Sequence, residues 1–405
     1  MEFRSVQLDN GLEIVAEINP SAFSQSLGYF VKTGSRDETP KMAGVSHFLE
    51  HMVFKGTDKR SAEDVNQELD DLGSQSNAYT SEEQTVYYMS VLPENQAHAL
   101  ELLSDIMRPA LRDDDFETEK QVIIEEIAMY DDQPPYGAVE RAMEEFFGDH
   151  PLARRVLGTR ETVLALDPVS MREYHQARYA PNNLTLVAAG AVEFDELVES
   201  AKKLTANWHP MDTARSLQRP KSPQADIELI HPPATQQYTL QHALGVSSSD
   251  NYRYVLRVLA SILGDDSGSR LFWALVDNGL AESAVVFTQE FDDCGLFSIY
   301  ATCSPEQHES NWDIIQSILA SGAEKPITER EIELAKNKIC SGLILSSERP
   351  SNRLFSVGGA WLKRERYETV AEVAANYQRV TQPQLQEAFE KLKSRSAVTV
   401  TVRPE

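Results

Sequence analysis

The chain has 405 residues, of which 41% are hydrophobic and 25% are charged. These fractions argue against a disordered, collagen-like or coiled-coil chain, and the length favours two or three domains. With 38 basic and 63 acidic residues the formal net charge is −25, which makes nucleic acids and anionic membrane surfaces poor bulk partners.

The first half of the chain begins with a hairpin pattern. Apolar and polar residues alternate on both sides of Asn10-Gly11, which supplies a tight turn. Thr39 and Pro40 predict the start of a helix that continues to Val53, since threonine is a good N-cap and proline fits the first helical turn. The other elements predicted here are strands at Phe3–Leu8, Leu12–Ile18, Ser26–Val31, Thr85–Leu92 and Leu184–Ala189, and helices at Ser61–Leu72, Glu94–Met107 and Asp113–Tyr130.

Residues 213–225 form the best candidate for a linker, because they lack a sustained apolar period and contain Pro220 and Pro223. The pattern after them is similar to that of the first half. It predicts strands at Asp226–Ile230, Gln237–Val246 and Ala397–Val402 and a helix at Asn251–Leu263. We therefore predict an α+β fold of two similar domains, 1–212 and 226–405, each a mostly antiparallel sheet with helices packed on one face. Two unrelated domains are the alternative.

The strongest chemical signal is His47-Phe48-Leu49-Glu50-His51. His47 and His51 are four residues apart, so on a helix they share one face and can bind one divalent metal. Glu50 lies at the edge of that face, where its carboxylate can reach a water on the metal without being a ligand, as in inverted H-E-x-x-H motifs. The spacing also occurs by chance. However, two imidazoles and a carboxylate in an apolar helix cost several kcal/mol unless they are paired or ligate a metal, so we favour a metal site.

A catalytic zinc site takes three protein ligands and keeps one open position. The predicted helix at Asp113–Tyr130 offers the third ligand, because Glu119 and Glu126 are two turns apart and point the same way. Glu125 competes with Glu126 but points away on this periodicity. For Glu117 and Glu125 a solvated acidic face is the simpler interpretation.

The segment His47–Thr57 resembles the zinc helix of the pitrilysin/insulinase-type metallopeptidases, especially the mitochondrial-processing-peptidase branch and its short bacterial relatives. The run from Glu119 to Glu126 is similar to that family's Glu-x6-Glu pair. The resemblance implies one Zn²⁺ per chain, bound by His47, His51 and Glu126, with Glu119 supporting the ligands. It also implies that Glu50 is the general base of a zinc metalloendopeptidase, and that 1–212 is the catalytic domain.

Asn77-Ala78-Tyr79-Thr80 resembles the substrate-facing edge strand of the same family. A peptide would bind there as an added β-strand through backbone hydrogen bonds, so the expected substrates are peptides or unfolded segments. Taken alone, Asn77 is more simply a turn residue before a strand. The acidity of the chain makes basic peptides attractive substrates.

The second half departs from the family pattern. Gly279-Leu280-Ala281 resembles the second domain of the family, but active members often carry a Tyr next, where this chain has Glu282. They also often carry an Arg that the run 275–278 lacks. The alternative function is therefore a non-catalytic or partner-dependent assembly subunit of a processing-peptidase-like complex. Because the family encloses its substrate between two domain pairs, we expect a homodimer or a heterodimer with a related subunit.

The three cysteines form no C-x-x-C pair, so we expect them to be core residues rather than zinc or redox ligands. The first residues lack the apolar region of a signal peptide. No stretch approaches the ~18 consecutive apolar residues of a membrane helix. We therefore expect a cytoplasmic protein that binds neither nucleic acid nor a membrane.

Overall fold

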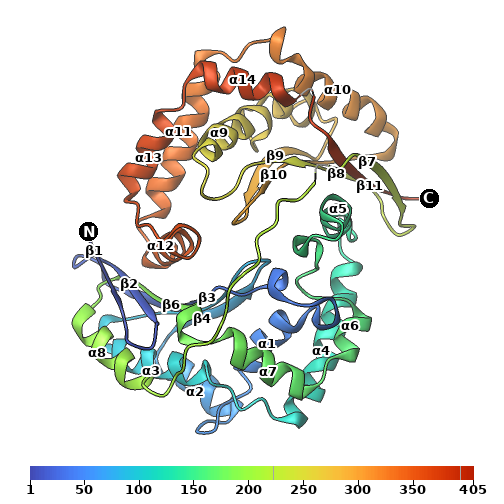
Figure 1. Cartoon of the computed structure of the whole chain (residues 1–405). Helices are drawn as coiled ribbons and strands as arrows, with labels where there is room; N and C mark the ends of the chain where they lie inside the picture. The colour runs from blue at the N-terminus through green and yellow to red at the C-terminus, as the bar shows by residue number, and fades with distance from the viewer. Residues whose placement is uncertain (222, 393) are drawn as a thin grey trace. The chain divides into compact units, whose positions relative to one another are not determined.

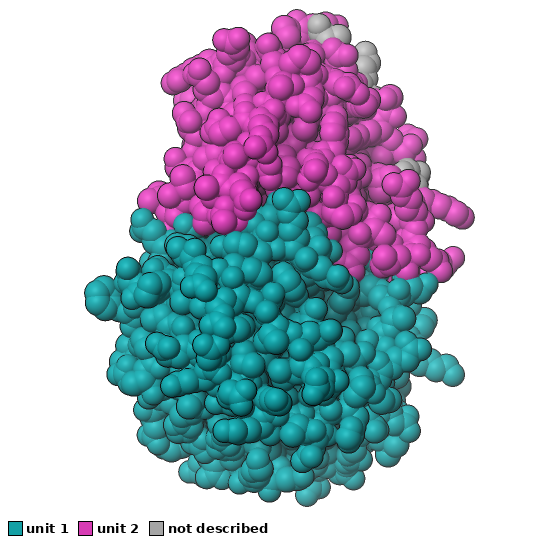
Figure 2. All heavy atoms as spheres, turned by 60° about the vertical axis from the view of Figure 1, so that its left-hand side comes forward, with its two compact units in different colours: residues 1–128, 154–216, 346–368 teal, residues 129–153, 217–345, 369–405 magenta. Residues whose placement is uncertain are grey.

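The computed structural model of the chain describes residues 1–221, 223–392 and 394–405. These residues form two compact units, which are coloured separately in Figure 2. Unit 1 comprises residues 1–128, 154–216 and 346–368, and unit 2 comprises residues 129–153, 217–345 and 369–405. Each unit combines one sheet with several helices (Figure 1), which confirms the predicted α+β fold of two similar domains.

Neither unit is continuous in sequence, whereas the sequence predicted domains over 1–212 and 226–405 joined by a linker over 213–225. Two segments make the difference, since 129–153 lies in unit 2 and 346–368 lies in unit 1. Each of them carries a helix whose apolar residues pack on the sheet of the unit to which it belongs. Within the predicted linker, Ser222 lies outside the described residues.

Unit 1 is built on a six-stranded sheet with the strand order β1-β2-β6-β3-β5-β4. The predicted hairpin forms, with Glu2 opposite Ile18 and Gln7 opposite Glu13. Neighbouring strands are antiparallel except β2 and β6, which are parallel. Strand β4 lies at the edge, so one side of its backbone can pair with a further strand. The strands are β1 (Glu2–Gln7), β2 (Glu13–Ile18), β3 (Gln25–Val31), β4 (Gln75–Thr80), β5 (Thr85–Val91) and β6 (Leu184–Gly190).

Helices cover both faces of this sheet, whereas the sequence predicted helices on one face only. The larger core lies between one face and helices that include α1, α3, α4, α7 and α8, and it contains the fully buried Tyr29 and Phe48. On the other face, α12 packs through Leu354 and Val357 against Phe30 (Figure 1). The helices of unit 1 are α1 (Val45–Val53), α2 (Ala62–Asp71), α3 (Gln96–Ile106), α4 (Asp113–Asp131), α6 (Arg160–Ala165), α7 (Pro168–Arg178), α8 (Phe194–Leu204) and α12 (Pro350–Arg364).

Unit 2 has a five-stranded sheet with the order β7-β11-β8-β10-β9, in which β7 and β11 are parallel. One face packs against α9, α10 and α14, and the other packs against α5. The predicted core positions of the cysteines are confirmed, because all three are buried. The elements are α5 (Ala138–Phe147), β7 (Ala225–Ile230), β8 (Gln237–Leu244), α9 (Tyr252–Gly264), β9 (Ser283–Glu290), β10 (Gly295–Cys303), α10 (His308–Ala320), α11 (Glu329–Ser346), α13 (Val370–Gln378), α14 (Gln382–Leu392) and β11 (Ala397–Arg403).

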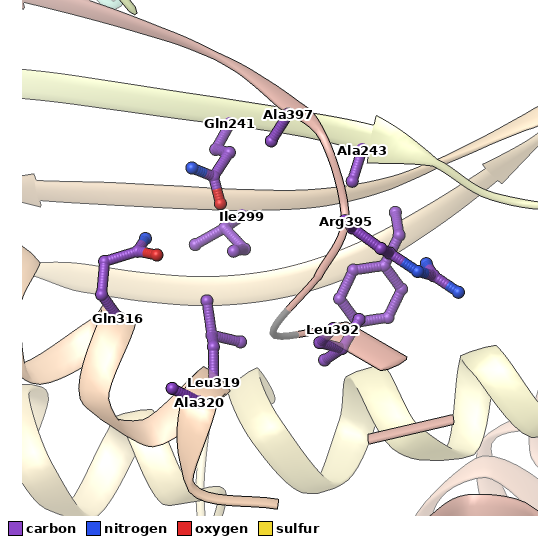
Figure 3. Close-up of a pocket in the computed structure, with 10 residues that line it drawn as sticks. Gln241, Ala243, Ile299, Gln316, Leu319, Ala320, Leu392, Arg395 and Ala397 are labelled. Carbon is purple, nitrogen blue, oxygen red and sulfur yellow. The ribbon is translucent and has the colours of Figure 1, made fainter. Parts of the chain in front are cut away.

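A small cavity of about 130 Å³ lies within unit 2 between the sheet and α10. Figure 3 shows Gln241 and Ile299 of the sheet facing Leu319 and Ala320 of the helix. The described side chains that line it include no histidine, cysteine or carboxylate. Among the described helices, none combines the length and the hydropathy needed to cross a membrane.

Candidate metal centre

Helix α1 carries both histidines of the motif, and it is capped differently from the prediction. Pro40 starts a separate short 3₁₀ turn, and α1 begins only at Val45. The buried carboxylate of Glu38 accepts hydrogen bonds from the backbone N–H groups of Gly44 and Ser46 at 2.8 and 2.7 Å. The predicted start at the threonine–proline pair is therefore wrong, because a carboxylate from the preceding loop satisfies the free N–H groups of the helix.

Two contacts fix the position of α1. Gly44 has a φ of +94°, and a Cβ at this position would lie 2.6 Å from the carbonyl oxygen of Leu157, so glycine is needed where the chain enters the helix. Further along, the ring of Phe48 stacks on that of Phe116 of α4 with their centroids 4.6 Å apart. These contacts hold the histidine face of α1 against α4.

The three predicted metal ligands converge. Glu126 Oε1 lies 3.8 Å from His47 Nε2, and Glu126 Oε2 lies 3.5 Å from His51 Nε2. Both separations exceed a normal hydrogen bond of about 2.7–3.2 Å. Two ligands of one tetrahedral zinc ion lie roughly 3.3–3.6 Å apart when each bond is about 2.0–2.2 Å. The 3.5 Å separation falls in this range and the 3.8 Å separation lies slightly above it. The donor set therefore fits zinc, whereas Glu125 of the same helix is exposed.

Glu119 orients one of the two imidazoles. Its Oε1 lies 2.8 Å from His51 Nδ1 and its Oε2 lies 2.5 Å from Lys55 Nζ. Although burial acts to raise the pKa of Glu119, these two partners outweigh it and lower the pKa below its ordinary value. An ionised Glu119 accepts a hydrogen bond from the Nδ1–H group of His51, which leaves the Nε2 lone pair of His51 free for a metal.

Glu50 is held by the edge strand. Its Oε2 accepts a hydrogen bond of 2.6 Å from the hydroxyl of Thr80. Burial raises the pKa of Glu50, and the hydrogen bond from Thr80 and the charge of His51 oppose that rise. A carboxylate beside the three converging ligands with a raised pKa has the properties of a general base.

His47 is the more buried of the two histidines and has fewer polar partners. Burial, assisted by His51, lowers the pKa of His47 to about 4, so its imidazole is neutral near pH 7. Its Nδ1 is buried and has no hydrogen-bond partner within the described part of the chain. For His51, burial acts to lower the pKa, but the hydrogen bond to Glu119 and the charges of Glu126, Glu119 and Glu50 raise it overall.

The four residues predicted to face substrate all lie on β4. Asn77 is exposed, and its Oδ1 accepts a hydrogen bond of 2.9 Å from the backbone N–H of Ala78. The ring of Tyr79 packs 5.9 Å from that of Phe355 in α12. Ala78 and Thr80 lie on the opposite side of the strand, since side chains alternate. Of these four residues, Thr80 is the one whose side chain is hydrogen-bonded to the motif within the described structure.

In unit 2 the sequence departs from the family pattern in two places, namely Glu282 in place of a tyrosine and the lack of an arginine in residues 275–278. Glu282 is exposed, and its carboxylate accepts a hydrogen bond from the side-chain amide of Gln236. Arg270 is the arginine nearest in sequence to the expected arginine position. Its guanidinium donates to Glu331 at 2.6 and 3.1 Å and to the carbonyl oxygens of Lys325 and Pro326. These contacts make Arg270 a structural residue.

A second group of potential metal ligands lies between α2 and α3, and it contains Glu68, His98 and Glu101. Here the guanidinium of Arg60 donates to both glutamates, with distances of 2.8 Å to Glu68 and 2.6 Å to Glu101. It also donates to Asp105 at 2.8 Å. A fixed cation already occupies this acidic group, so it is not a comparable metal centre.

Sequence reasoning missed three groups that support the centre, namely Glu38, Lys55 and the side-chain role of Thr80. Lys55 lies four residues after His51 in the turn that follows α1, and the four-residue spacing from the motif could have indicated it. Glu38 and Thr80 act across the chain rather than along one helix. No periodic pattern in the sequence predicts such contacts.

The sequence matches two protein-family descriptions that together cover most of the chain. Residues 13–160 match "Insulinase (Peptidase family M16)", and residues 165–339 match "Peptidase M16 inactive domain". The histidine motif and the two glutamates of α4 lie within the first match. Relatives with full-length similarity include an uncharacterized zinc protease of Mycobacterium tuberculosis, 33% identical over 97% of this chain and 91% of the relative, and the uncharacterized zinc protease YmxG of Bacillus subtilis, 33% identical over 92% of each.

Solved structures show the same fold. A protease from Helicobacter pylori has a TM-score of 0.91 and 22% identity, and it covers 100% of this chain and 99% of its own. An M16-like peptidase from Alicyclobacillus acidocaldarius has a TM-score of 0.88 and 23% identity over 100% and 98% of the two chains. A chain of complex III2 from Candida albicans has a TM-score of 0.86 and 18% identity over 98% and 95%.

Proposed function

Because this chain belongs to the insulinase-type peptidase family M16, we propose that it is a zinc-dependent endopeptidase with His47, His51 and Glu126 as the zinc ligands. The relatives named zinc proteases and the family itself imply a metallopeptidase that uses zinc. The observation that carries the proposal is the convergence of two imidazole nitrogens and one carboxylate within 4.8 Å of one another. We expect one zinc ion per chain.

The roles of the side chains follow from their contacts. A zinc ion bound by these ligands would polarise the scissile carbonyl and activate a water molecule. Glu50, whose carboxylate is partly buried beside the ligands, accepts a proton and later returns it to the leaving amine. Glu119 accepts a hydrogen bond from the Nδ1–H group of His51, so that Nε2 of the same ring is available as the ligand atom.

The substrate in this proposal is an extended peptide or an unfolded segment that pairs with β4. Two observations support the mode of binding: β4 is an edge strand, and its last residue contacts Glu50. A peptide added to this edge gains backbone hydrogen bonds that do not depend on its sequence. With a net charge of −25 the chain also favours basic peptides.

The proposal is tested by the variant Glu50→Gln, which removes the proton acceptor and keeps the size of the side chain. We expect peptide cleavage to fall by about 10²–10⁴-fold, the usual contribution of a general base, while bound zinc remains at the wild-type level. Cleavage of a mixed peptide library is followed by mass spectrometry, and metal is measured in the same samples. In the wild type, a chelator should abolish cleavage and added zinc should restore it.

A wild-type protein that binds no zinc and shows no chelator-sensitive cleavage would contradict the proposal. It would favour the alternative function, a non-catalytic assembly subunit. The substitution at Glu282 and the arginine missing from residues 275–278 motivate that alternative. We further propose that the active form is a dimer of this chain or a heterodimer with a related, processing-peptidase-like subunit.

A further inference from the structure

We infer that Thr80 is a positioning residue whose hydroxyl holds the carboxylate of Glu50 in the orientation needed for proton transfer. The inference rests on the proposed function, and it gives Thr80 a side-chain role beyond the substrate contact predicted from the sequence. The hydrogen bond from Thr80 Oγ1 to Glu50 Oε2 is 2.6 Å long. This length is typical of a hydroxyl that donates to a carboxylate, which is among the stronger hydrogen bonds in proteins.

The β4–β5 hairpin that carries Thr80 is anchored by contacts with the rest of unit 1. It lies opposite Thr85 at the end of the β4–β5 hairpin. The turn of this hairpin is bound to the preceding loop, because the backbone N–H of Arg36 donates to the carbonyl oxygen of Glu82 at 2.8 Å. In addition, the guanidinium of Arg36 forms a buried ion pair of 2.8 Å with Glu83. A support anchored in this way limits the movement of the Thr80 hydroxyl, which favours precise positioning of its partner.

The hydroxyl of Thr80 donates its hydrogen bond to Glu50. A threonine hydroxyl has one proton to donate, and Glu50 is its near acceptor. The neighbouring Thr85 hydroxyl donates to the carbonyl oxygen of Thr33 at 2.9 Å and lies 3.5 Å from Thr80 Oγ1. Because Thr80 is β-branched, its χ1 angle is also restricted, so the direction of the hydroxyl is defined by the strand.

This arrangement links substrate binding to the base. The outer side of β4 has no neighbouring strand in the sheet, so a peptide can pair there, while the side chain of Thr80 on the same strand contacts Glu50. A peptide that pairs with β4 therefore lies on the element that fixes the base relative to it. Correct relative placement of the reacting groups contributes a large share of enzymatic rate, and misplacement by about 1 Å can cost about 100-fold.

The test is Thr80→Val, which is nearly isosteric and removes only the donor, with Thr80→Ser as the conservative variant. We expect Thr80→Val to lower kcat by about 10–100-fold with KM within about twofold of the wild type and with unchanged zinc content. Thr80→Ser should recover most of kcat, because it keeps the hydroxyl. Thr185→Val is the matched control, since Thr185 lies on β6 of the same sheet and its side chain makes no hydrogen bond to another described residue.

The outcomes separate this inference from the proposed function. A kcat of Thr80→Val within about twofold of the wild type, while Glu50→Gln is inactive, overturns the role of Thr80 and leaves the peptidase intact. A loss that Thr80→Ser does not recover also overturns it, because the loss then reflects strand packing. If Thr80→Val does not fold, Thr80→Ala is compared with Thr80→Ser by the same criterion. A wild type without chelator-sensitive cleavage overturns both proposals.

Discussion

The Nε2 atoms of His47 and His51 both lie near the carboxylate of Glu126. The contacts that hold the two rings in place differ. His51 is anchored through Nδ1 to Glu119, which is itself paired with Lys55. His47 is held by packing, because its Nδ1 has no hydrogen-bond partner among the described residues. Loss of Glu119 should therefore loosen one ligand and leave the other in place.

We predict that Glu119→Ala lowers the affinity for zinc by about 10–100-fold, the usual effect of removing a residue that orients a metal ligand. Glu119→Gln should cost less, because the amide oxygen can still accept the His51 proton. Affinity is measured by competition with a chromophoric chelator. Glu125→Gln on the same helix is the control, since Glu125 is exposed. An unchanged affinity in Glu119→Ala would contradict the orienting role.

At the scale of single elements, α12 is held on the sheet of unit 1 by a buried ion pair. Arg353 of this helix donates to both carboxylate oxygens of Glu17 in β2 at 2.7 and 2.5 Å, and the hydroxyl of Tyr367 donates to Glu17 at 2.7 Å. Burial alone would raise the pKa of Glu17, but these hydrogen bonds lower it. Glu17 is thus ionised and depends on its partners.

Removal of one member of this pair should destabilise the protein strongly. We predict that Arg353→Met lowers the free energy of unfolding by about 3–5 kcal/mol, because it leaves a buried carboxylate without its counter-charge. The double variant Glu17→Gln with Arg353→Met should recover part of the loss, since no charge is then left unpaired. Urea unfolding of the variants measures both effects. Equal instability of the single and double variants would show that packing, and not charge, is responsible.

The elements also show which features a sequence can predict. The β1–β2 hairpin, α4 and β11 agree with the alternation and helical periodicity of their residues, because these patterns record which side of an element is buried. The shared face of His47 and His51 on α1, and the placement of Glu126 rather than Glu125 beside it, follow the same rule. By contrast, the carboxylate cap of α1 and the hydrogen bond from Thr80 to Glu50 join residues from separate elements. Local patterns hold no information about such contacts.

The packing of α5 and α12 could not be predicted for the same reason, because it also depends on contacts between separate elements. Each helix is amphipathic, and periodicity predicts an apolar face but not the sheet that will cover it. In the structure, α5 packs with strands that follow it in the chain, and α12 packs with strands that precede it by more than a hundred residues. A single domain boundary at the predicted linker therefore assigned α5 and α12 to the wrong units.

At the scale of the whole molecule, we predict that the active species is a dimer. By the resemblance described above, active members of the family often carry an arginine and a tyrosine in the second domain. This chain has neither at the matching positions, and Arg270 is paired with Glu331. Size-exclusion chromatography should show twice the mass of the 45.4 kDa chain, or a complex with a related subunit. Full chelator-sensitive activity in a strictly monomeric fraction would contradict the prediction.

Helix α12 packs on strands that lie much earlier in the chain. This has a consequence for synthesis of the chain on the ribosome. The six strands of unit 1 are complete by Gly190, but α12 is encoded only at Pro350–Arg364. At about 5–20 residues per second, the helix emerges roughly 8–30 s after the last of those strands. During that interval the apolar side chains of Phe30 and Val187 have no cover from α12, so the nascent N-terminal half exposes a surface prone to aggregation until Arg364 has been translated.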